Sequence, residues 1–182
     1  MDTCASSYRR YLNGDGEAFD EIVKELFDPL VFFIDRMVGD TAAAEDIAID
    51  AFTELIVHKH RYNFKVQLKT YLFMIGRSRA LNYIKHRKRL AETELQEADH
   101  ADDRQSLEEQ FVRSERHRQL QEALQTLPED MRIALHLVYF EELSYEDTAK
   151  VMKKTKKQVD NLLYRAKKAL RTMLEKEGEL FL

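Results

Sequence analysis

Residues that break helices are scarce in this chain, which has five glycines and two prolines among 182 residues. Sandwiches and barrels draw many of their tight turns from these two residue types, so their scarcity favours long helices. Apolar residues also recur at helical spacing, as in Phe19, Ile22, Val23, Leu26 and Phe27. We therefore predict an all-α fold.

The first 89 residues predict four helices around one small core. The pair Asp28-Pro29 is typical of an N-cap followed by the first helical residue, so a helix over residues 19–27 should end there and a second should begin. Gly39-Asp40-Thr41 leads into a third helix. A basic connector, residues 58–69, precedes a fourth, which ends in the run KHRKR at residues 85–89.

The remaining chain predicts a linker and a second helical domain. Residues 90–116 are polar and acidic, which indicates an exposed linker or, alternatively, one long solvated helix. Pro128 is suited to a helix start. The expected organisation is two small domains, residues 1–89 and 117–182, joined by the linker at residues 90–116.

Charge is segregated along the chain. Residues 1–57 hold four basic and thirteen acidic side chains, whereas residues 58–89 hold ten basic and no acidic ones. Residues 90–130 hold four basic and twelve acidic side chains, and residues 131–182 hold eleven and eight. The net charge of −4 therefore conceals two basic segments that each follow an acidic one. This pattern indicates two separate contacts with a polyanion.

The last third has the pattern of a helix-turn-helix. Ser144, with an acid at Asp147, is typical of a helix N-cap before a short helix over residues 145–152. The polar turn KKT follows, and then a basic helix over residues 156–175. Residues 152–171 carry eight basic side chains and one acid, as expected of a helix that enters a DNA groove. The alternative is a basic solvated helix that packs on a partner protein.

The stretch LQEALQTLPEDMRIALHLVYFEELSYEDTAKVMKKTKKQVDNLLYRAKKAL resembles sigma region 4 of the extracytoplasmic-function (ECF) group. The first domain is similar to region 2 of the same group, on Gly39-Asp40, Ala44-Glu45-Asp46-Ile47 and Tyr71-Leu72. The resemblance covers about residues 19–89 and 117–174, in the family's order. It implies a non-catalytic RNA polymerase sigma factor, with no cofactor, that directs transcription from specific promoters.

The resemblance also implies partners and site residues. Region 2 would bind the clamp of the largest polymerase subunit, region 4 the flap of the second-largest subunit, and both would contact promoter DNA, with an anti-sigma factor as a further partner. Polymerase contacts would come from Glu45, Asp46, Asp50 and Glu54. Contacts to the −10 element would come from Arg61, Tyr62, Asn63, Phe64, Lys65, Ser78, Arg79, Asn82, Lys85 and Arg87. Contacts to the −35 element would come from Lys156, Lys157, Gln158, Asp160, Asn161, Tyr164, Arg165 and Lys168.

Four positions depart from the family's usual residues. Tyr71 stands where Trp is usual and Ser78 where Asn is usual, so the preferred −10 sequence does not follow from the family. Lys157 stands where Gly is common and Asp160 where a basic residue or Ser is common. For the aromatic residues Tyr62, Phe64 and Tyr71, a place in the core is favoured over a role as stacking platform.

Other site chemistry has little basis in the sequence. The His58-x-His60 pair lacks a nearby thiol or a second ligand pair, so no metal site is expected. The single Cys4 is interpreted as a free thiol on a frayed N-terminus. The longest apolar run, about residues 29–34, is far short of the ~20 residues of a membrane span, so we expect a cytoplasmic protein without membrane insertion.

Two other functional classes remain open at this point. A self-sufficient repressor or activator with an effector-sensing domain would dimerise and bind duplex DNA tightly without polymerase. A helical adaptor that binds only proteins would tolerate charge reversal at Lys156 and Arg165. Neither explains a block of ten basic residues after an acidic helix.

Overall fold

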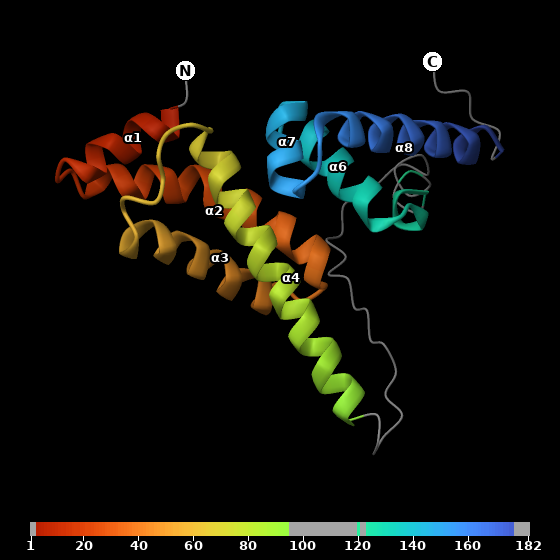
Figure 1. Ribbon diagram of the computed structural model, residues 1–182, viewed down its shortest axis with the longest axis horizontal. Helices are drawn as coiled ribbons and strands as arrows, with labels where there is room; N and C mark the ends of the chain where they lie inside the picture. The colour runs from red at the N-terminus through yellow and green to blue at the C-terminus, as the bar shows by residue number, and fades with distance from the viewer. Residues whose placement is uncertain (1–2, 95–119, 121–122, 177–182) are drawn as a thin grey trace, which may run out of the picture. The chain divides into compact units, whose positions relative to one another are not determined.

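A computed structural model describes residues 3–94, 120 and 123–176, and all the regular elements among them are helices (Figure 1). The chain divides into two compact units, Met1–Ser106 and Leu107–Leu182. The first unit contains α1 (Thr3–Leu12), α2 (Glu17–Val38), α3 (Thr41–Val57) and α4 (Leu68–Glu94). The second contains α6 (Glu129–Tyr139), α7 (Tyr145–Met152) and α8 (Lys156–Lys176). The predicted all-α fold is confirmed.

Helix α2 is the central element of the first unit, where it contacts α1, α3 and α4. Its buried face includes Leu30, Phe33 and Ile34, and the Phe33 ring lies 5.0 Å from that of Phe73 on α4. Gly76 allows α4 to approach this face closely, because a Cβ atom there would lie 2.9 Å from Leu30 Cδ1. The spacing between α2 and α4 therefore depends on a residue without a side chain.

The prediction of a helix break at Asp28-Pro29 is wrong, since α2 runs through Pro29 without interruption. Proline inside a helix removes one backbone hydrogen bond and usually kinks or ends the helix. Here Leu26 before Pro29 and Leu30 after it are both buried on the same face of α2. Packing of both halves against one core outweighs the local cost.

The first residues form a helix that the sequence analysis did not anticipate. Cys4 lies in α1 and is only 4% exposed, so the interpretation as a thiol on a frayed terminus is wrong. Tyr8 of the same helix is completely buried. The first unit thus has the predicted number of four helices, but not the predicted four. Helix α1 was not predicted, and α2 is one helix where two were predicted.

Helix α4 begins and ends at different residues than predicted. It starts at Leu68, within the expected connector, and continues past the basic run to Glu94. Its last five residues therefore lie in the segment predicted as the linker. The boundary between the two units, after Ser106, also falls in that segment. Residues 95–116 of the predicted linker lie outside the described residues.

Helices of the second unit begin and end where local signals predict. Pro128 is the N-cap residue of α6, and the Ser144 side chain accepts a hydrogen bond from the Asp147 backbone N–H at the start of α7. Lys153 ends α7 in the left-handed conformation, with φ of 54°, and α8 begins three residues later. Leu137, Val151, Val159, Leu163 and Ala166 form much of the buried core.

Candidate functional site

The outer face of α3 carries the acidic residues predicted to contact polymerase. Glu45, Asp46 and Asp50 are exposed, whereas the Glu54 side chain is only 20% exposed. They are exposed because the helix is amphipathic and its opposite face packs into the core. The buried residues of that face are Ala44, Ile47, Ala48, Ala51, Phe52 and Leu55. Three large apolar residues of α3 are also exposed: Ile49, Ile56 and Val57. The sequence analysis missed them, although their positions outside the buried stripe were a usable signal.

Two of these acids bind arginines of the predicted DNA-contacting set. Arg79 of α4 donates to Asp50 at 3.1 Å and to Glu54 at 2.8 Å, and Arg61 donates to Glu54 at 2.9 Å. Partial burial by itself raises the pKa of Glu54, but the hydrogen bonds from Arg79 and Arg61 outweigh it, and the net pKa is lowered. We call these four residues the acid–arginine network. It joins the two predicted binding surfaces.

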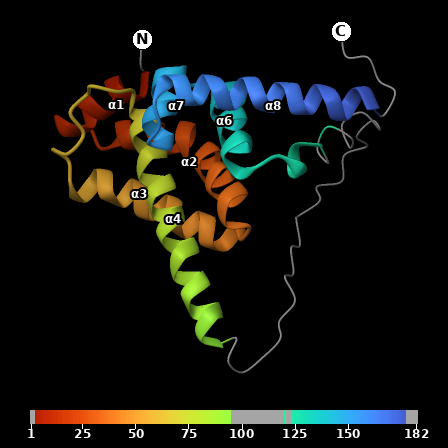
Figure 2. The ribbon, with the colours of Figure 1, turned by 45° about the vertical axis from the view of Figure 1, so that its right-hand side comes forward.

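The segment between α3 and α4, residues 58–67, has a defined shape, and we call it the connector loop. Asn63 Oδ1 accepts a hydrogen bond from the Lys65 backbone N–H at 3.1 Å, and the Tyr62 hydroxyl donates to the Val66 carbonyl at 2.7 Å. Phe64 has a φ of 59°, which is rare for a bulky residue. The loop runs beside α1 in two views of the molecule (Figure 1 and Figure 2).

The predicted −10 residues of the connector loop differ in accessibility. Arg61, Asn63 and Lys65 are exposed, and Phe64 is half-buried. Tyr62 is only 3% exposed, and its ring packs 4.6 Å from Phe64 and 5.2 Å from Tyr71. Tyr62 is therefore a core residue that supports the loop, which is the place that the sequence favoured for it, and in this structure its ring is not accessible to a base.

The predicted −10 residues of α4 lie on more than one face. Ser78, Asn82 and Lys85 are spaced so that they share one side of the helix, whereas Arg87 is half a turn away from them. Asn82, Lys85 and Arg87 are exposed, whereas Ser78 is half-buried. Helical spacing therefore places Ser78, Asn82 and Lys85 along one side of α4, in its middle and second half, and leaves Arg87 apart.

Helix α8 presents most of the predicted −35 residues on one exposed face. Lys157, Asp160, Asn161, Tyr164 and Lys168 are all exposed and follow the spacing of one helix side. Arg165 lies at the edge of this face. The opposite side is buried through Val159, Leu163 and Ala166.

The first turn of α8 is held by local contacts. Gln158 Oε1 accepts from the Thr155 N–H at 2.8 Å, and Thr155 Oγ1 accepts from the Gln158 N–H at 3.2 Å, which is a reciprocal cap. Lys156 forms an ion pair with Glu146 of α7, and this hydrogen bond raises the pKa of Lys156. Gln158 and Lys156 thus have structural partners, whereas the side chains of Lys157, Asn161 and Lys168 form no hydrogen bond or ion pair with another described residue.

Neither a metal site nor a membrane span emerges from the described parts of the chain. No group of three or more His, Cys, Asp or Glu side chains that could hold a metal occurs among residues 3–94, 120 and 123–176. In the same residues, no helix is both long and apolar enough to cross a bilayer.

Comparison with known proteins identifies the family. The family described as Sigma-70 region 2 matches residues 22–90, and Sigma-70, region 4 matches residues 117–170. The RNA polymerase sigma-H factor of Pseudomonas aeruginosa is 33% identical over 175 residues, which cover 91% of each chain. The chain belongs to the RNA polymerase sigma factors. The predicted family, and the order of its two regions along the chain, are confirmed.

Two relatives carry the ECF designation that the sequence analysis predicted for this sigma factor. The ECF RNA polymerase sigma factor SigM of Bacillus subtilis is 28% identical over 160 residues, which cover 85% of this chain and 93% of SigM. SigW of the same organism is 26% identical over 170 residues. The protein is an alternative sigma factor that directs promoter-specific transcription with RNA polymerase.

Solved structures share the fold of this sigma factor. The co-crystal structure of RpoE with the anti-sigma factor NepR from Bartonella quintana matches with a TM-score of 0.70 at 20% identity, over 86% of this chain and 96% of the other. The structure of CnrH with the cytosolic domain of CnrY matches with a TM-score of 0.63 at 17% identity, over 97% of both chains.

Proposed function

We propose that this sigma factor acts through three surfaces: the acidic face of α3, the connector loop with α4, and the exposed face of α8. The acidic face binds core polymerase, the loop and α4 hold the opened −10 element, and α8 reads the −35 element. The observation that carries the proposal is the segregation of charge, with acids on α3 and basic side chains on the other two surfaces.

The acidic face has the composition of a protein-binding surface. Its carboxylates, Glu45, Asp46 and Asp50, suit arginines on a partner, because charge-assisted hydrogen bonds are the strong ones. The exposed Ile49 and Ile56 add apolar area that a protein partner can bury. We assign this surface to the clamp of the largest polymerase subunit.

The connector loop and α4 have the composition of a single-strand binding surface. Exposed Arg61, Asn63 and Lys65 lie in the same loop as the half-buried Phe64, and aromatic rings near cations bind unstacked bases. Asn82 and Lys85 extend this surface along α4. Binding of the displaced strand stabilises the open promoter, so strand opening requires no catalytic group.

The exposed face of α8 has the shape and charge for the major groove. Its first residues lie at the N-terminus of the second helix of a helix-turn-helix, where base edges are read. Asn161 can bond to adenine, and Lys157 and Lys168 can neutralise phosphates. Asp160 can accept from a cytosine amino group.

Three further assignments belong to this proposal. The sigma factor is a non-catalytic subunit that works in the cytoplasm. The polymerase flap contacts its second unit. An anti-sigma factor controls it, which is supported by the match to RpoE in complex with NepR.

Transcription with purified components tests the proposal. Bacterial core RNA polymerase is incubated with sheared genomic DNA of the source organism, with and without the chain, and start sites are mapped by sequencing of transcript 5′ ends. We expect a set of start sites that requires the chain. If the chain neither binds core polymerase nor changes the start sites, the proposal fails.

Charge reversal separates the polymerase surface from general charge effects. The variant Glu45→Lys, Asp46→Lys should lower affinity for core polymerase at least about tenfold, since like charges placed in an interface cost several kcal/mol. The variant Glu25→Lys, Asp28→Lys on α2 is the matched control, because both residues are also exposed but lie outside the proposed surfaces. Equal loss in both variants would contradict the assignment of α3.

A further inference from the structure

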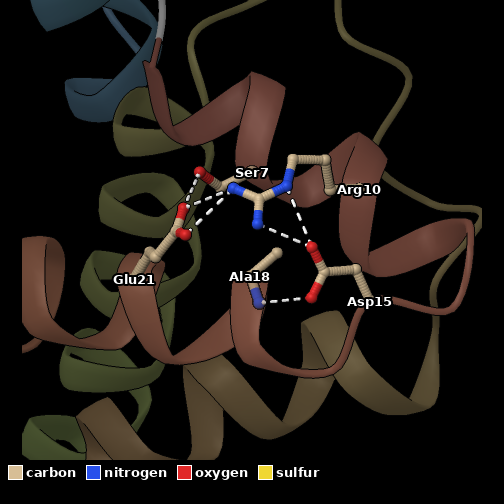
Figure 3. Close-up of polar contacts among 5 residues, drawn as sticks. All are labelled: Ser7, Arg10, Asp15, Ala18 and Glu21. Carbon is tan, nitrogen blue, oxygen red and sulfur yellow. Dashed lines mark hydrogen bonds and ion pairs between the residues drawn. The ribbon is translucent and has the colours of Figure 1, made fainter.

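Two neighbouring arginines of α1 have different surroundings. Arg10 is held by carboxylates, with Nη2 2.6 Å from Asp15 and Nη1 2.9 Å from Glu21 (Figure 3). Glu21 also accepts a hydrogen bond from the Ser7 hydroxyl at 2.7 Å, and this bond and those from Arg10 lower the pKa of Glu21. The charge of Arg10 is therefore compensated within the fold, and its contacts fasten α1 to the start of α2.

Arg9 is exposed and has an aromatic partner instead of an acidic one. Its Cζ atom lies 4.5 Å from the centre of the Phe64 ring in the connector loop. No ion pair joins Arg9 to a carboxylate among the residues that the structure describes. Its positive charge is thus available to a partner from outside the chain, while its guanidinium lies over the Phe64 ring.

Arg9 ends a series of tilted aromatic contacts that leads from the buried Tyr62 to the surface. The Tyr71 and Tyr62 rings are 5.2 Å apart, and those of Tyr62 and Phe64 are 4.6 Å apart. The Phe64 ring in turn contacts the Arg9 guanidinium in a cation–π interaction. The middle of this series is fixed, because Tyr62 is a core residue. The exposed end is a planar cation.

Helix α1 also fixes the connector loop that carries Phe64. The Tyr8 hydroxyl lies 2.9 Å from the Leu55 carbonyl and 3.2 Å from that of Lys59, at the start of the loop. Burial raises the pKa of Tyr8 to about 12, so the hydroxyl remains a donor at neutral pH. Lys59 in turn lies over the Tyr11 ring at 4.8 Å. These contacts hold the loop although Phe64 has an unfavourable positive φ.

We propose that Arg9 is a contact for single-stranded promoter DNA, in which an unstacked base lies on the outer face of the guanidinium while Phe64 covers the inner face. Bases stack on arginine planes as well as on aromatic rings. The inference rests on the proposed role of the connector loop in −10 binding. It extends that surface to α1, which lies outside the segment matched as region 2, residues 22–90.

The test measures how the sigma holoenzyme binds a single-stranded oligonucleotide. The probe is the non-template strand across the −10 element of a promoter mapped in the transcription experiment. A second series of probes replaces one base at a time by an abasic site. We expect Arg9→Ala to weaken binding of the intact probe about five- to thirty-fold, and the abasic site at one position to abolish that difference.

Two other variants separate stacking from charge and from stability. Arg9→Lys keeps the positive charge but loses the planar guanidinium. The salt dependence of binding should therefore stay as in the wild type, but the abasic site should no longer weaken binding more than it does in Arg9→Ala. Arg10→Ala removes the neighbouring arginine whose charge is already compensated, so its effect should be the same on intact and abasic probes. Thermal unfolding of Arg9→Ala should match that of the wild type.

Each outcome decides between the two proposals. If the wild-type holoenzyme binds the probe and Arg9→Ala binds equally well, the role of Arg9 is refuted and the −10 surface stands. If Arg9→Ala weakens all probes alike, Arg9 acts on the backbone and stacking is refuted. If the wild type does not bind the probe, the proposed −10 surface fails and the Arg9 contact fails with it.

Discussion

The two units differ in the range of the contacts that shape their proposed DNA-binding surfaces. In the first unit, Arg79 of α4 binds Asp50 and Glu54 of α3, residues that are 29 and 25 positions away in the chain. In the second, Ser144 with Asp147 and Thr155 with Gln158 make caps across three positions. The first basic surface depends on contacts between helices distant in the chain, whereas local caps determine the helix starts of the second, beside an ion pair between the neighbouring helices α7 and α8.

This difference has a functional consequence. The acid–arginine network ties two cations of the proposed −10 surface to two acids of the proposed polymerase surface. Polymerase arginines that bind Asp50 and Glu54 would compete with Arg61 and Arg79. On the exposed face of α8 the cations Lys157, Arg165 and Lys168 stand outside any such network among the described residues. Only the first surface is therefore suited to respond to polymerase binding.

Phe33→Ala should show the largest effect, since the placement of the network depends on the core of the first unit. Phe33 is 1% exposed, so removal of its ring should lower the free energy of unfolding by about 3–5 kcal/mol. Hydrogen exchange should then accelerate in α2, α3 and α4. The adjacent Phe32 is 49% exposed, and Phe32→Ala should cost less than about 1 kcal/mol. Similar costs for the two variants would contradict the packing of α2.

Glu54→Gln tests the network itself. The variant loses charge-assisted hydrogen bonds from both Arg61 and Arg79, so we expect a loss of about 1–2 kcal/mol in the free energy of unfolding near neutral pH. Denaturant unfolding at several pH values measures it. Glu45→Gln is the control, since Glu45 is exposed on the same helix and should change stability little.

The effect of Glu54→Gln should also depend on pH with a defined sign. The pKa of Glu54 is lowered in the folded state, so the carboxylate stabilises the fold above the pKa of an unfolded glutamate. That stabilisation is lost as the pH falls through the lower, folded pKa. The wild type and the variant should therefore converge in stability on acidification. A constant difference at all pH values would show that the ion pairs are not its source.

Ser144→Ala tests the local control of the second unit. The variant removes the acceptor for the Asp147 N–H at the start of α7, so it should cost about 1 kcal/mol in the free energy of unfolding. Hydrogen exchange of α7 and α8 should accelerate while that of α2 is unchanged. Ser144→Thr keeps a hydroxyl acceptor and should restore most of the loss. If it does not, the cap is not the cause.

The same difference explains which parts of the structure the sequence could predict. The bounds of α7 and the start of α8 follow from Ser144 and the KKT turn, because caps and turns act over a few residues. In the first unit, Pro29 predicted a break that burial of Leu26 and Leu30 prevents. Tertiary contacts decide that outcome, and no local signal reports them.

The candidate sites show the same division. Most of the predicted −35 residues lie on one face of α8, because helical spacing alone determines that arrangement. The pairing of Arg79 with Asp50 and Glu54 of α3 depends on contacts between distant segments. Arg9 was not predicted at all, since its partner Phe64 is 55 positions away. The roles of all these residues in DNA binding remain predictions.

Glu146→Gln should show the smallest effect on stability and sharpens the comparison most. The Lys156–Glu146 pair is fully exposed, so its loss should leave the free energy of unfolding unchanged within error. Release of Lys156 should nevertheless strengthen binding to duplex −35 DNA at low salt. The plot of log K against log salt should become steeper, by at most about one unit for one additional phosphate contact.

Glu142→Gln provides the matched control for that experiment. Glu142 is also exposed and precedes α7, but the structure gives it no ion pair with any described residue. Its neutralisation changes net charge by the same amount without releasing a lysine. A steeper slope in Glu146→Gln alone would mean that α7 restrains one cation of the second unit, as the acid–arginine network restrains two in the first. An equal change in both variants would mean that only net charge matters, and that Glu146 does not compete with DNA for Lys156 of α8.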